Sequence, residues 1–272
     1  MKSTAPIQTL MLASGHGVQV YDVLASTSQA ARTLIETAPA APTGLWILAH
    51  RQTDGIGRRG RAWHQREGDF AATLILPLTS EDQKSRDGAH SFLAALSVRD
   101  AVAQTLAGAR TDATCGAPAK VQIKWPNDIL INGEKCAGLL LELVQRAGRH
   151  FLTIGIGINL VSHPGNLPYR ATHLTAHLGP KGTPPAPVAV LKGIDSRLAA
   201  WRSQWQREGF APIRTAWLGV AAGLGAQITV RLPDHTLTGR FAGLDESGQL
   251  ILGTANGTTL INVGDVFFGP PQ

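Results

Sequence analysis

A segment rich in glycine and arginine, QTDGIGRRGRAW at residues 52–63, is the part of the sequence best suited to bind an anion. Glycines let the backbone approach a ligand closely, and arginines bind phosphate through paired hydrogen bonds. The glycines also match the spacing GxGxxG, but that fingerprint binds a dinucleotide where the loop opens a helix, and this loop leads into a strand pattern. We therefore predict a phosphate-binding loop, with a solvated basic turn as the alternative. The side chains expected to contact a nucleotide are Arg58, Arg59, Arg61 and Trp63.

A second candidate site lies in KWPNDILINGEKCAG, residues 124–138, whose Asn-Gly pair is a strong signal for a two-residue hairpin turn. A turn at this pair places Asp128 opposite Ala137, and it puts Asp128 and Lys135 on the same face as diagonal neighbours. A carboxylate and an ammonium held together on a stiff hairpin are able to serve a metal-bound phosphate and a developing anion. The alternative is an ion pair with a structural role alone.

Alternate glycines mark a third segment, GIGIN at residues 155–159, and leave one strand face open to a flat ligand or another backbone. Other chemistries lack their residues. His173 and His177 have helical metal-ligand spacing, but Leu174 replaces the glutamate of the HExxH motif. Cys115 and Cys136 stand in neither a CxxC pair nor a zinc spacing, so both are expected to be reduced thiols. The sequence therefore contains no direct metal-binding motif.

The elements that must position these segments follow from capping and periodicity. Ser26 and Gln29 form a capping box that opens a helix, and apolar residues at every third or fourth position predict two more helices over 89–106 and 188–205. Apolar runs and alternation predict the strands 18–21, 45–49, 71–76, 121–125, 128–144 with its hairpin turn, and 151–159. Residues 108–118 are expected to form a loop.

The pattern changes near residue 220, where short strands separated by turns begin. Their spacing predicts a small β-barrel with strands at 227–232, 238–244, 249–253, 258–261 and 266–268. We therefore predict an N-terminal tail (1–17), a mixed α/β domain (18–220) that carries the candidate site, and a small all-β domain (221–272). The last domain is net acidic, whereas basic charge concentrates in the 52–63 loop, which suits a compact anion better than a nucleic-acid backbone.

Composition narrows the class of protein further. The 272-residue chain is 43% hydrophobic and 16% charged, which is ordinary for a globular protein. No apolar run approaches the roughly 18 residues that a membrane span requires, and the N-terminus has no clear signal-peptide cleavage site. Together with two cysteines, these features predict a cytoplasmic protein that does not associate with membranes.

Taken in order, the motifs resemble those of the biotin protein ligases, which attach biotin to carboxylase carrier domains. Ser26-Thr27, GRRGRAW, KWPNDI, KCAGLL and GIGIN stand at suitable separations, and the combination of KWPND with GRRGRxW is highly specific. The resemblance runs from about residue 21 to residue 268. It implies an α+β fold in which a mixed-sheet domain, related to class II aminoacyl-tRNA synthetases and lipoate ligases, precedes a small barrel like a Src-homology-3 domain.

The resemblance also implies a two-step ligase reaction. Biotin and MgATP give biotinyl-5′-AMP and pyrophosphate, and a lysine of a biotin carboxyl carrier protein, such as that of acetyl-CoA carboxylase, then attacks the mixed anhydride and releases AMP. The biotin-binding residues implied are Ser26, Thr27, Ser28, Gln52, Gly55, Ile56, Gly57, Arg58, Lys135, Gly138, Gly155 and Gly157. The implied ATP or adenylate contacts are Arg58, Arg59, Arg61, Trp63, Lys124, Asn127 and Asn159. The implied catalytic residues are Lys135, Arg58 and Asp128, the last near Mg²⁺.

The sequence departs from the family pattern in places. Ile56 replaces the first arginine of a loop that usually reads GRGRRGR, Ala25 stands where an acidic residue is common, and HQREGDF at 64–70 replaces x-Ser-Pro-x-Gly-x-Asn. A lipoate-type ligase shares the adenylation chemistry but not KWPND. A biotin-responsive nucleic-acid-binding regulator carries a helix-turn-helix module, for which the residues before the first expected strand are too few. We therefore expect no specific DNA binding, and the resemblance leaves a homodimer open.

Overall fold

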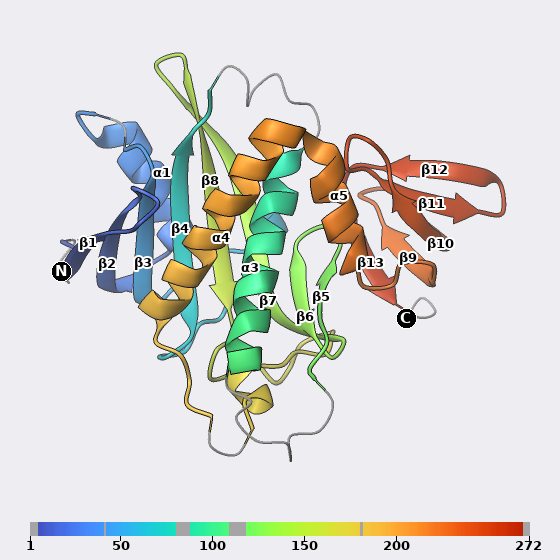
Figure 1. The fold of residues 1–272 in the computed structure, drawn as a ribbon, viewed down its shortest axis with the longest axis horizontal. Coiled ribbons are helices and arrows are strands. Elements are labelled where there is room, and N and C mark those ends of the chain that lie inside the picture. Colours follow the sequence, from blue (N-terminus) through green and yellow to red (C-terminus); the bar gives the residue numbers. More distant parts are fainter. Residues whose placement is uncertain (1–4, 41, 80–87, 109–117, 180–181, 269–272) are drawn as a thin grey trace.

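A computed structural model describes residues 5–40, 42–79, 88–108, 118–179 and 182–268. They form an eight-stranded mixed sheet with helices and a separate five-stranded antiparallel sheet, which confirms the predicted α+β class (Figure 1). The order of the large sheet is β1-β2-β3-β4-β8-β7-β6-β5. Its strands are β1 (Gln8–Met11), β2 (Gly17–Leu24), β3 (Leu45–Gln52), β4 (Phe70–Pro77), β5 (Val121–Lys124), β6 (Asp128–Ile131), β7 (Glu134–Arg146) and β8 (Arg149–Ile158).

Strand β1 lies in the segment that we expected to be an N-terminal tail, so that prediction is wrong for residues 8–11. It pairs antiparallel with β2 at the edge of the large sheet, with Leu10 opposite Val18. A strand of four residues at an edge buries little by itself, and therefore its sequence carries a weak alternation signal. Strands β2 and β3 run parallel, which makes the sheet mixed.

Helices cover the two faces of the large sheet unequally. On one face, α3 (Ala89–Gly108) packs against α4 (Pro187–Glu208) and α5 (Phe210–Gly219), as Figure 1 shows. On the other face, α1 (Thr27–Thr37) packs against β3, β4, β7 and β8. Alternation along β3 divides the two cores, because Trp46 and Leu48 join the large core under α3 and α4 while Ile47 joins the small one under α1. The rest of the α1 face carries the candidate site.

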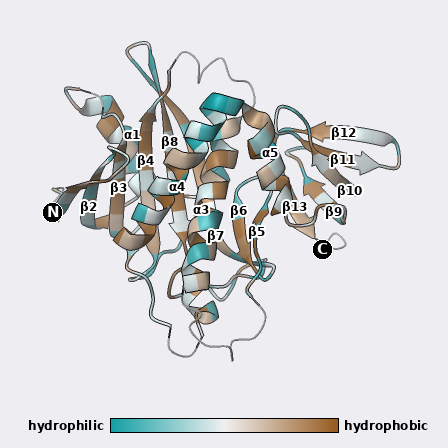
Figure 2. Ribbon diagram, viewed as in Figure 1, coloured by the Kyte–Doolittle hydropathy of each residue, from teal (hydrophilic) through white to brown (hydrophobic). Residues whose placement is uncertain are grey.

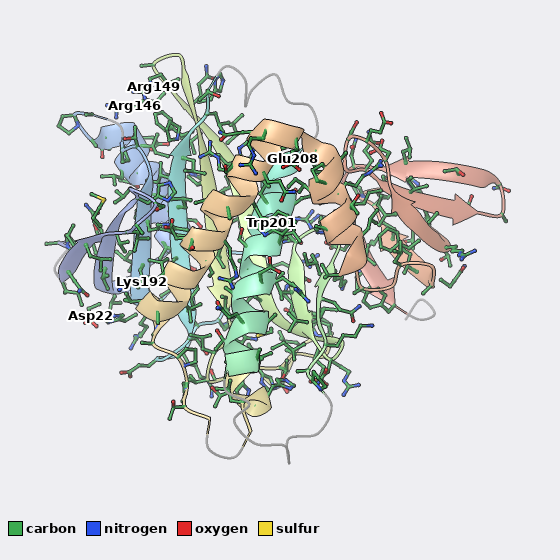
Figure 3. All side chains as sticks on the ribbon, in the orientation of Figure 1. Asp22, Arg146, Arg149, Lys192, Trp201 and Glu208 are labelled. Carbon is green, nitrogen blue, oxygen red and sulfur yellow. The ribbon has the colours of Figure 1, made fainter. Side chains whose placement is uncertain are left out.

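The helices begin and pack largely as the sequence predicts. Ser26 caps α1, and its side chain accepts a hydrogen bond from the Gln29 N–H. Helix α5 was not predicted; it follows α4 directly after Gly209, whose φ of 74° allows a sharp change of direction. Figure 2 shows hydrophobic residues along the strands of the large sheet and hydrophilic residues on parts of the helices. Trp201 of α4 (Figure 3) donates to Asp100 of α3 at 3.0 Å, so this tryptophan links the two helices.

A buried carboxylate joins α4 to the large sheet. Asp195 accepts hydrogen bonds from Trp46 Nε1 at 2.8 Å and from His16 Nδ1 at 2.6 Å. Burial raises the pKa of Asp195, but these hydrogen bonds outweigh it and hold the pKa below its ordinary value. The charge is therefore kept in the core by its donors.

The predicted small all-β domain is confirmed as a five-stranded antiparallel sheet in the order β12-β11-β10-β9-β13. In Figure 1, β13 lies beside the β5–β6 end of the large sheet. The strands are β9 (Gln227–Arg231), β10 (Thr236–Leu244), β11 (Leu250–Thr254), β12 (Gly257–Ile261) and β13 (Asp265–Phe268).

Two further sequence expectations concern membrane-spanning helices and the segment 108–118. Within the described ranges, no helix has the length and apolar character needed to cross a membrane. Cys115 and nearly all of the loop expected at 108–118 lie outside the described residues.

Candidate active site

A cluster of uncharged polar side chains lies where α1 begins. Gln52 Oε1, at the end of β3, accepts from the Thr27 N–H at 2.8 Å and from the Thr27 hydroxyl at 3.1 Å. Thr73 of β4 donates to Thr27 Oγ1 at 2.9 Å and lies 3.2 Å from Ser28 Oγ. Ser26, Thr27, Ser28 and Gln52, which were predicted together, therefore lie together. Thr73 was not predicted, and its one signal is a hydroxyl in an otherwise apolar strand.

The glycines of β7 and β8 permit close packing, but the groups that approach them belong to this chain. A Cβ on Gly157 would lie 2.2 Å from Trp63 Cε2, and a Cβ on Gly155 would lie 2.6 Å from Ser28 Oγ. Gly138 pairs with Gly157 across the strands and also faces the Trp63 ring. The glycines therefore permit close approach as expected, here by the flat Trp63 indole and the Ser28 hydroxyl, and their contact with a ligand stays a prediction.

The β6–β7 hairpin brings Asp128 and Lys135 together as predicted. Lys135 Nζ is 2.7 Å from Asp128 Oδ1, and both side chains are about four-fifths buried. The register differs from the prediction, because a bulge after Lys135 places Asp128 opposite Gly138 and not opposite Ala137. The turn itself forms at Asn132-Gly133, whose positive φ angles of 52° and 84° suit a type I′ turn.

Lys135 is enclosed by aromatic rings. Its ammonium lies 5.9 Å from the centroid of the Trp63 ring and 5.3 Å from that of Tyr169. The backbone of Lys135 also pairs with the segment that carries Tyr169, since the Lys135 N–H donates to the Arg170 carbonyl at 3.0 Å. A pocket is lined by Trp63, Lys135, Asn159, Tyr169 and Ala171, among others. Tyr169 was missed because its contact with Lys135 depends on a loop that returns from β8.

The arginine loop is folded back on itself. Residues Arg58–Gly60 form a single turn of 3₁₀ helix, and the Gly57 N–H donates to the Arg61 carbonyl at 2.7 Å. Ile56, which replaces the usual arginine, pairs through its backbone with Ala62 in an isolated bridge. Ile56 is 39% exposed. Upstream, a Cβ on Gly55 would lie 2.4 Å from the Trp63 carbonyl, which explains the glycine there. The loop is therefore an ordered structure.

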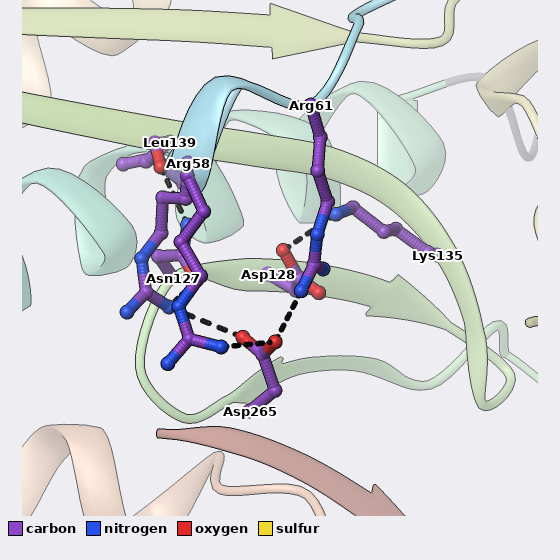
Figure 4. Close-up of polar contacts among 8 residues, drawn as sticks. Arg58, Arg61, Asn127, Asp128, Lys135, Leu139 and Asp265 are labelled. Carbon is purple, nitrogen blue, oxygen red and sulfur yellow. Dashed lines mark hydrogen bonds and ion pairs between the residues drawn. The ribbon is translucent and has the colours of Figure 1, made fainter. Parts of the chain in front are cut away.

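The arginine side chains converge on the turn between β5 and β6 and on the small domain (Figure 4). Arg58 Nη1 donates to Asn127 Oδ1 at 3.1 Å, and Asn127 donates to the Leu139 carbonyl. Arg59 Nη1 donates to Asp265 Oδ2 at 3.0 Å, and Arg61 donates to the same oxygen. Burial lowers the pKa of Arg58, although a guanidinium stays charged at any physiological pH.

Lys124 adds a fourth cation between the two domains. Its ammonium lies 5.6 Å from the ring centroids of both Phe267 and Phe268 in β13. Burial lowers the pKa of Lys124, while the charge of Asp128, opposite it in the β5–β6 pair, opposes that shift. The described site thus gathers more cationic than anionic side chains, and this suits it to a polyanion.

The unusual segment after Trp63 is fixed by hydrogen bonds. Gln65 Nε2 donates to the carbonyls of Ala49, His50 and Asp69, and Gln65 Oε1 accepts from the Gln52 N–H at 2.9 Å. Asp69 accepts from three successive backbone N–H groups at residues 160–162. The departures from the family pattern therefore anchor the loop in place.

Several of the predicted or candidate residues make structural contacts. Asn159 is 5% exposed and donates to the Thr172 carbonyl at 3.0 Å. His177 contacts the Thr172 hydroxyl, and His173 lies 2.9 Å from His163. Burial raises the pKa of the Cys136 thiol, which keeps it from acting as a nucleophile. Among the described residues no group of three potential metal ligands gathers.

Comparisons with known proteins match both parts of this architecture. The family model "Biotin/lipoate A/B protein ligase family" matches residues 20–159, and the model "Biotin protein ligase C terminal domain" matches residues 223–269. The chain is 38% identical over 255 residues to a biotin–[acetyl-CoA-carboxylase] ligase of Paracoccus denitrificans, covering 91% of this chain and 100% of that protein. It is 32% identical over 260 residues to the bifunctional ligase/repressor BirA of Bacillus subtilis, covering 94% of this chain and 75% of that protein.

Solved structures share the fold. A biotin protein ligase from Aquifex aeolicus, in complex with biotin and ATP, superposes with a TM-score of 0.73 at 23% identity, over 92% of this chain and 97% of that one. A biotin protein ligase from Leishmania major, in complex with biotinyl-5-AMP, gives a TM-score of 0.61 at 25% identity, over 90% of this chain and 98% of that one.

Proposed function

Because the chain belongs to the biotin/lipoate protein ligase family, we propose that its site joins biotin to ATP and then transfers the biotinyl group to a lysine of a biotin carboxyl carrier domain. The observation that carries this proposal is that an uncharged polar cluster and a cationic cluster lie on one face of the large sheet. They are linked by Trp63, which contacts the glycine face, and by Lys135 beside it. Biotin has an uncharged ureido ring at one end and a carboxylate at the other, so it matches this gradient of polarity.

At the uncharged end, the ureido group would take its hydrogen bonds from the cluster at the start of α1. Thr27 bonds Gln52 and Thr73, and Ser28 contacts Thr73, so these hydroxyl and amide groups already form a network at 2.8–3.2 Å. A ligand that replaces these contacts finds donors and acceptors held in place by α1 and β4. The proposed biotin residues Gly138, Gly155 and Gly157 line the same face, with the Trp63 ring against two of them.

At the charged end, the first step forms a bond between a biotin carboxylate oxygen and the α-phosphorus of ATP. The bond from that phosphorus to the bridging oxygen breaks, and pyrophosphate leaves with the electron pair. Lys135 would donate to the α-phosphate, where negative charge must be stabilised in the transition state. Asp128 positions the ammonium through its 2.7 Å contact, and Arg58, held by Asn127, would bind the phosphate from the other side.

In the second step, the carrier amine attacks the acyl carbon, the acyl–oxygen bond breaks and AMP departs. The attacking amine must be neutral and must lose a proton as the amide forms. Asp128, a carboxylate of the hairpin, would accept the hydrogen bond and then the proton of this amine, since Lys135 engages Oδ1 alone in the contact described. This role also fits the partial exposure of Asp128, which is 18%.

The site offers Mg²⁺ a carboxylate, that of Asp128. Magnesium in nucleotide sites usually takes one or two carboxylates together with substrate phosphates. Asp128 would supply such an oxygen, and the described residues contain no group of three potential ligands that would form a protein cage. We propose that Mg²⁺ enters with ATP and, when bound, reduces the negative charge of the phosphates.

The test is mass spectrometry of a carboxylase carrier domain incubated with this protein, biotin and MgATP. We expect the mass of one biotinyl group to be added, and no addition to a carrier whose acceptor lysine is replaced by arginine. Absence of product with an intact carrier, under conditions where the Paracoccus relative is active, would contradict the proposal.

Two alternatives have weaker support. The Paracoccus relative and the Aquifex and Leishmania structures are named as biotin ligases, which does not favour a lipoate ligase. A thermal-shift comparison should show stabilisation by biotin and none by lipoate.

We also propose no sequence-specific DNA binding, because Arg59 and Arg61 are engaged by Asp265 and are assigned to the nucleotide. Selective sub-micromolar binding to a biotin-gene promoter at about 150 mM salt would overturn that proposal.

A further inference from the structure

Asp265, at the start of β13 in the small domain, reaches across to the arginine loop of the large domain (Figure 4). Its carboxylate accepts from Arg59 and Arg61 and lies 4.0 Å from Arg58 Nη1. The Asp265 side chain is 14% exposed, whereas those of Arg59 and Arg61 are 35% and 60% exposed. One largely buried anion thus holds arginines that still face the solvent.

The three arginines need an anion between them. They lie within one turn of the loop, and their like charges act against one another, since Arg59 and Arg61 both disfavour the charge of Arg58. Asp265 offsets this repulsion with a single negative charge. A carboxylate between three guanidinium groups leaves part of their donor capacity unused, because each guanidinium has five N–H donors.

The same arginines are assigned above to the phosphates of ATP, and they cannot hold a carboxylate and a polyphosphate in the same way at once. We infer that Asp265 is a built-in competing anion: it positions the arginine loop when the nucleotide is absent, gives up Arg59 and Arg61 to the triphosphate, and takes them back as pyrophosphate leaves. This inference rests on the proposed function, because it needs a polyphosphate at the loop.

Charge explains why the exchange runs in both directions. A triphosphate carries more negative charge and more acceptor oxygens than one carboxylate, so it outcompetes Asp265 when its concentration is high. Pyrophosphate has lost its covalent link to the adenylate, so only non-covalent contacts hold it. Asp265 is tethered beside the arginines and competes with pyrophosphate at a high effective concentration.

The experiment compares Asp265→Asn with wild type in the adenylation step. Asparagine keeps the size and an acceptor oxygen but removes the charge. We expect the KM for ATP and the inhibition constant of pyrophosphate both to fall, by about 5- to 10-fold, the difference between a charged and a neutral hydrogen bond. Asp265→Glu restores the charge and should return both constants toward wild type. The control is Asp234→Asn, which removes the same charge from an exposed turn of the same domain and should change neither constant.

Direct titration calorimetry with pyrophosphate in the absence of biotin separates the possible failures. If wild type binds pyrophosphate and forms biotinyl-AMP, but Asp265→Asn has unchanged or raised constants, Asp265 is a structural brace and the inference is overturned. A raised KM accompanied by a lower melting temperature counts against it in the same way. If wild type itself forms no adenylate, the proposed function fails, and tighter pyrophosphate binding by Asp265→Asn would still support competition at the loop.

Discussion

Asp69 and Asp265 are both largely buried carboxylates, but they hold their neighbours through different kinds of donor. Asp69 accepts from the backbone N–H groups of Leu160, Val161 and Ser162 at 2.8, 2.9 and 3.2 Å, and from the Ser162 hydroxyl at 2.7 Å. Asp265 accepts from long arginine side chains of the other domain. The first carboxylate organises backbone, and the second binds groups that can rotate away.

The difference indicates which part of the site is fixed and which part responds to ligand. Backbone donors cannot leave Asp69 unless the chain after β8 unfolds locally, so this contact anchors the end of the strand that carries the glycines. Arginine donors can leave Asp265 by rotating their side chains, because the alternative partner is a phosphate. Substitutions near Asp69 should therefore alter stability, and substitutions in the charged cluster should alter chemistry at nearly constant stability.

The largest effect on chemistry is expected from Lys135→Ala. Loss of a donor that stabilises transition-state charge costs about 10²- to 10³-fold in rate, and often more when the group is unique. Biotin-dependent pyrophosphate exchange should fall to background while circular dichroism stays unchanged. Lys192→Ala, on the surface of α4, is the matched control (Figure 3). Near-normal exchange would reduce the Lys135–Asp128 contact to a structural ion pair.

The largest effect on stability is expected from Asp69→Ala. The change leaves several buried N–H groups without their acceptor, which should lower the free energy of unfolding by about 3 kcal/mol. Asp69→Asn keeps an acceptor oxygen and should cost less. Urea unfolding measures both, with the exposed Asp22→Ala as control (Figure 3). A loss no larger than the control would remove the distinction between the two carboxylates.

Arg58→Ala should change ligand retention by an intermediate amount. One charge-assisted hydrogen bond contributes roughly 1.5–3 kcal/mol, so biotinyl-AMP should dissociate about 10- to 150-fold faster. Rapid filtration of preformed adenylate gives the rate, and Arg149→Ala, on the distant β7–β8 hairpin, is the control. An unchanged dissociation rate would take Arg58 out of the nucleotide site.

The smallest effect concerns the pH dependence of stability. Burial raises the pKa of Asp265, but the hydrogen bond and charge of Arg61, with Arg59 and Arg58, outweigh it and keep the pKa below 3.8. A carboxylate whose pKa is lowered by folding stabilises the folded state above its unfolded pKa, and this contribution is lost as the pH falls through the folded pKa. The free energy of unfolding of wild type should exceed that of Asp265→Asn by about 1 kcal/mol or less at neutral pH.

Urea unfolding at several pH values tests this last expectation. The difference between wild type and Asp265→Asn should shrink once the pH falls below the ordinary aspartate pKa of about 4 and vanish below the lowered pKa of the folded state. A difference that is constant with pH would show that the arginines do not stabilise the ionised form of Asp265. The contrast with Asp69 would then have no basis in charge.

Local signals in the sequence were reliable because they depend on contacts a few residues apart. Ser26 caps its helix through Gln29, and Asn132-Gly133 turns the hairpin with both residues at positive φ. The motifs then placed Asp128 beside Lys135, since a two-residue turn determines which side chains share a face. The family resemblance added the polar cluster around Thr27.

Tertiary structure alone decided what fills and surrounds the site. The bulge after Lys135 changed the register by one residue, and the Trp63 ring covers a glycine face that looked open. The partners of Thr73 and Asp265 could not be read from the sequence, because each lies far along the chain: Thr27 for the first and the arginine loop, about 200 residues earlier, for the second. Such contacts arise from the packing of whole elements, and the sequence near each residue does not predict which distant residue it will contact.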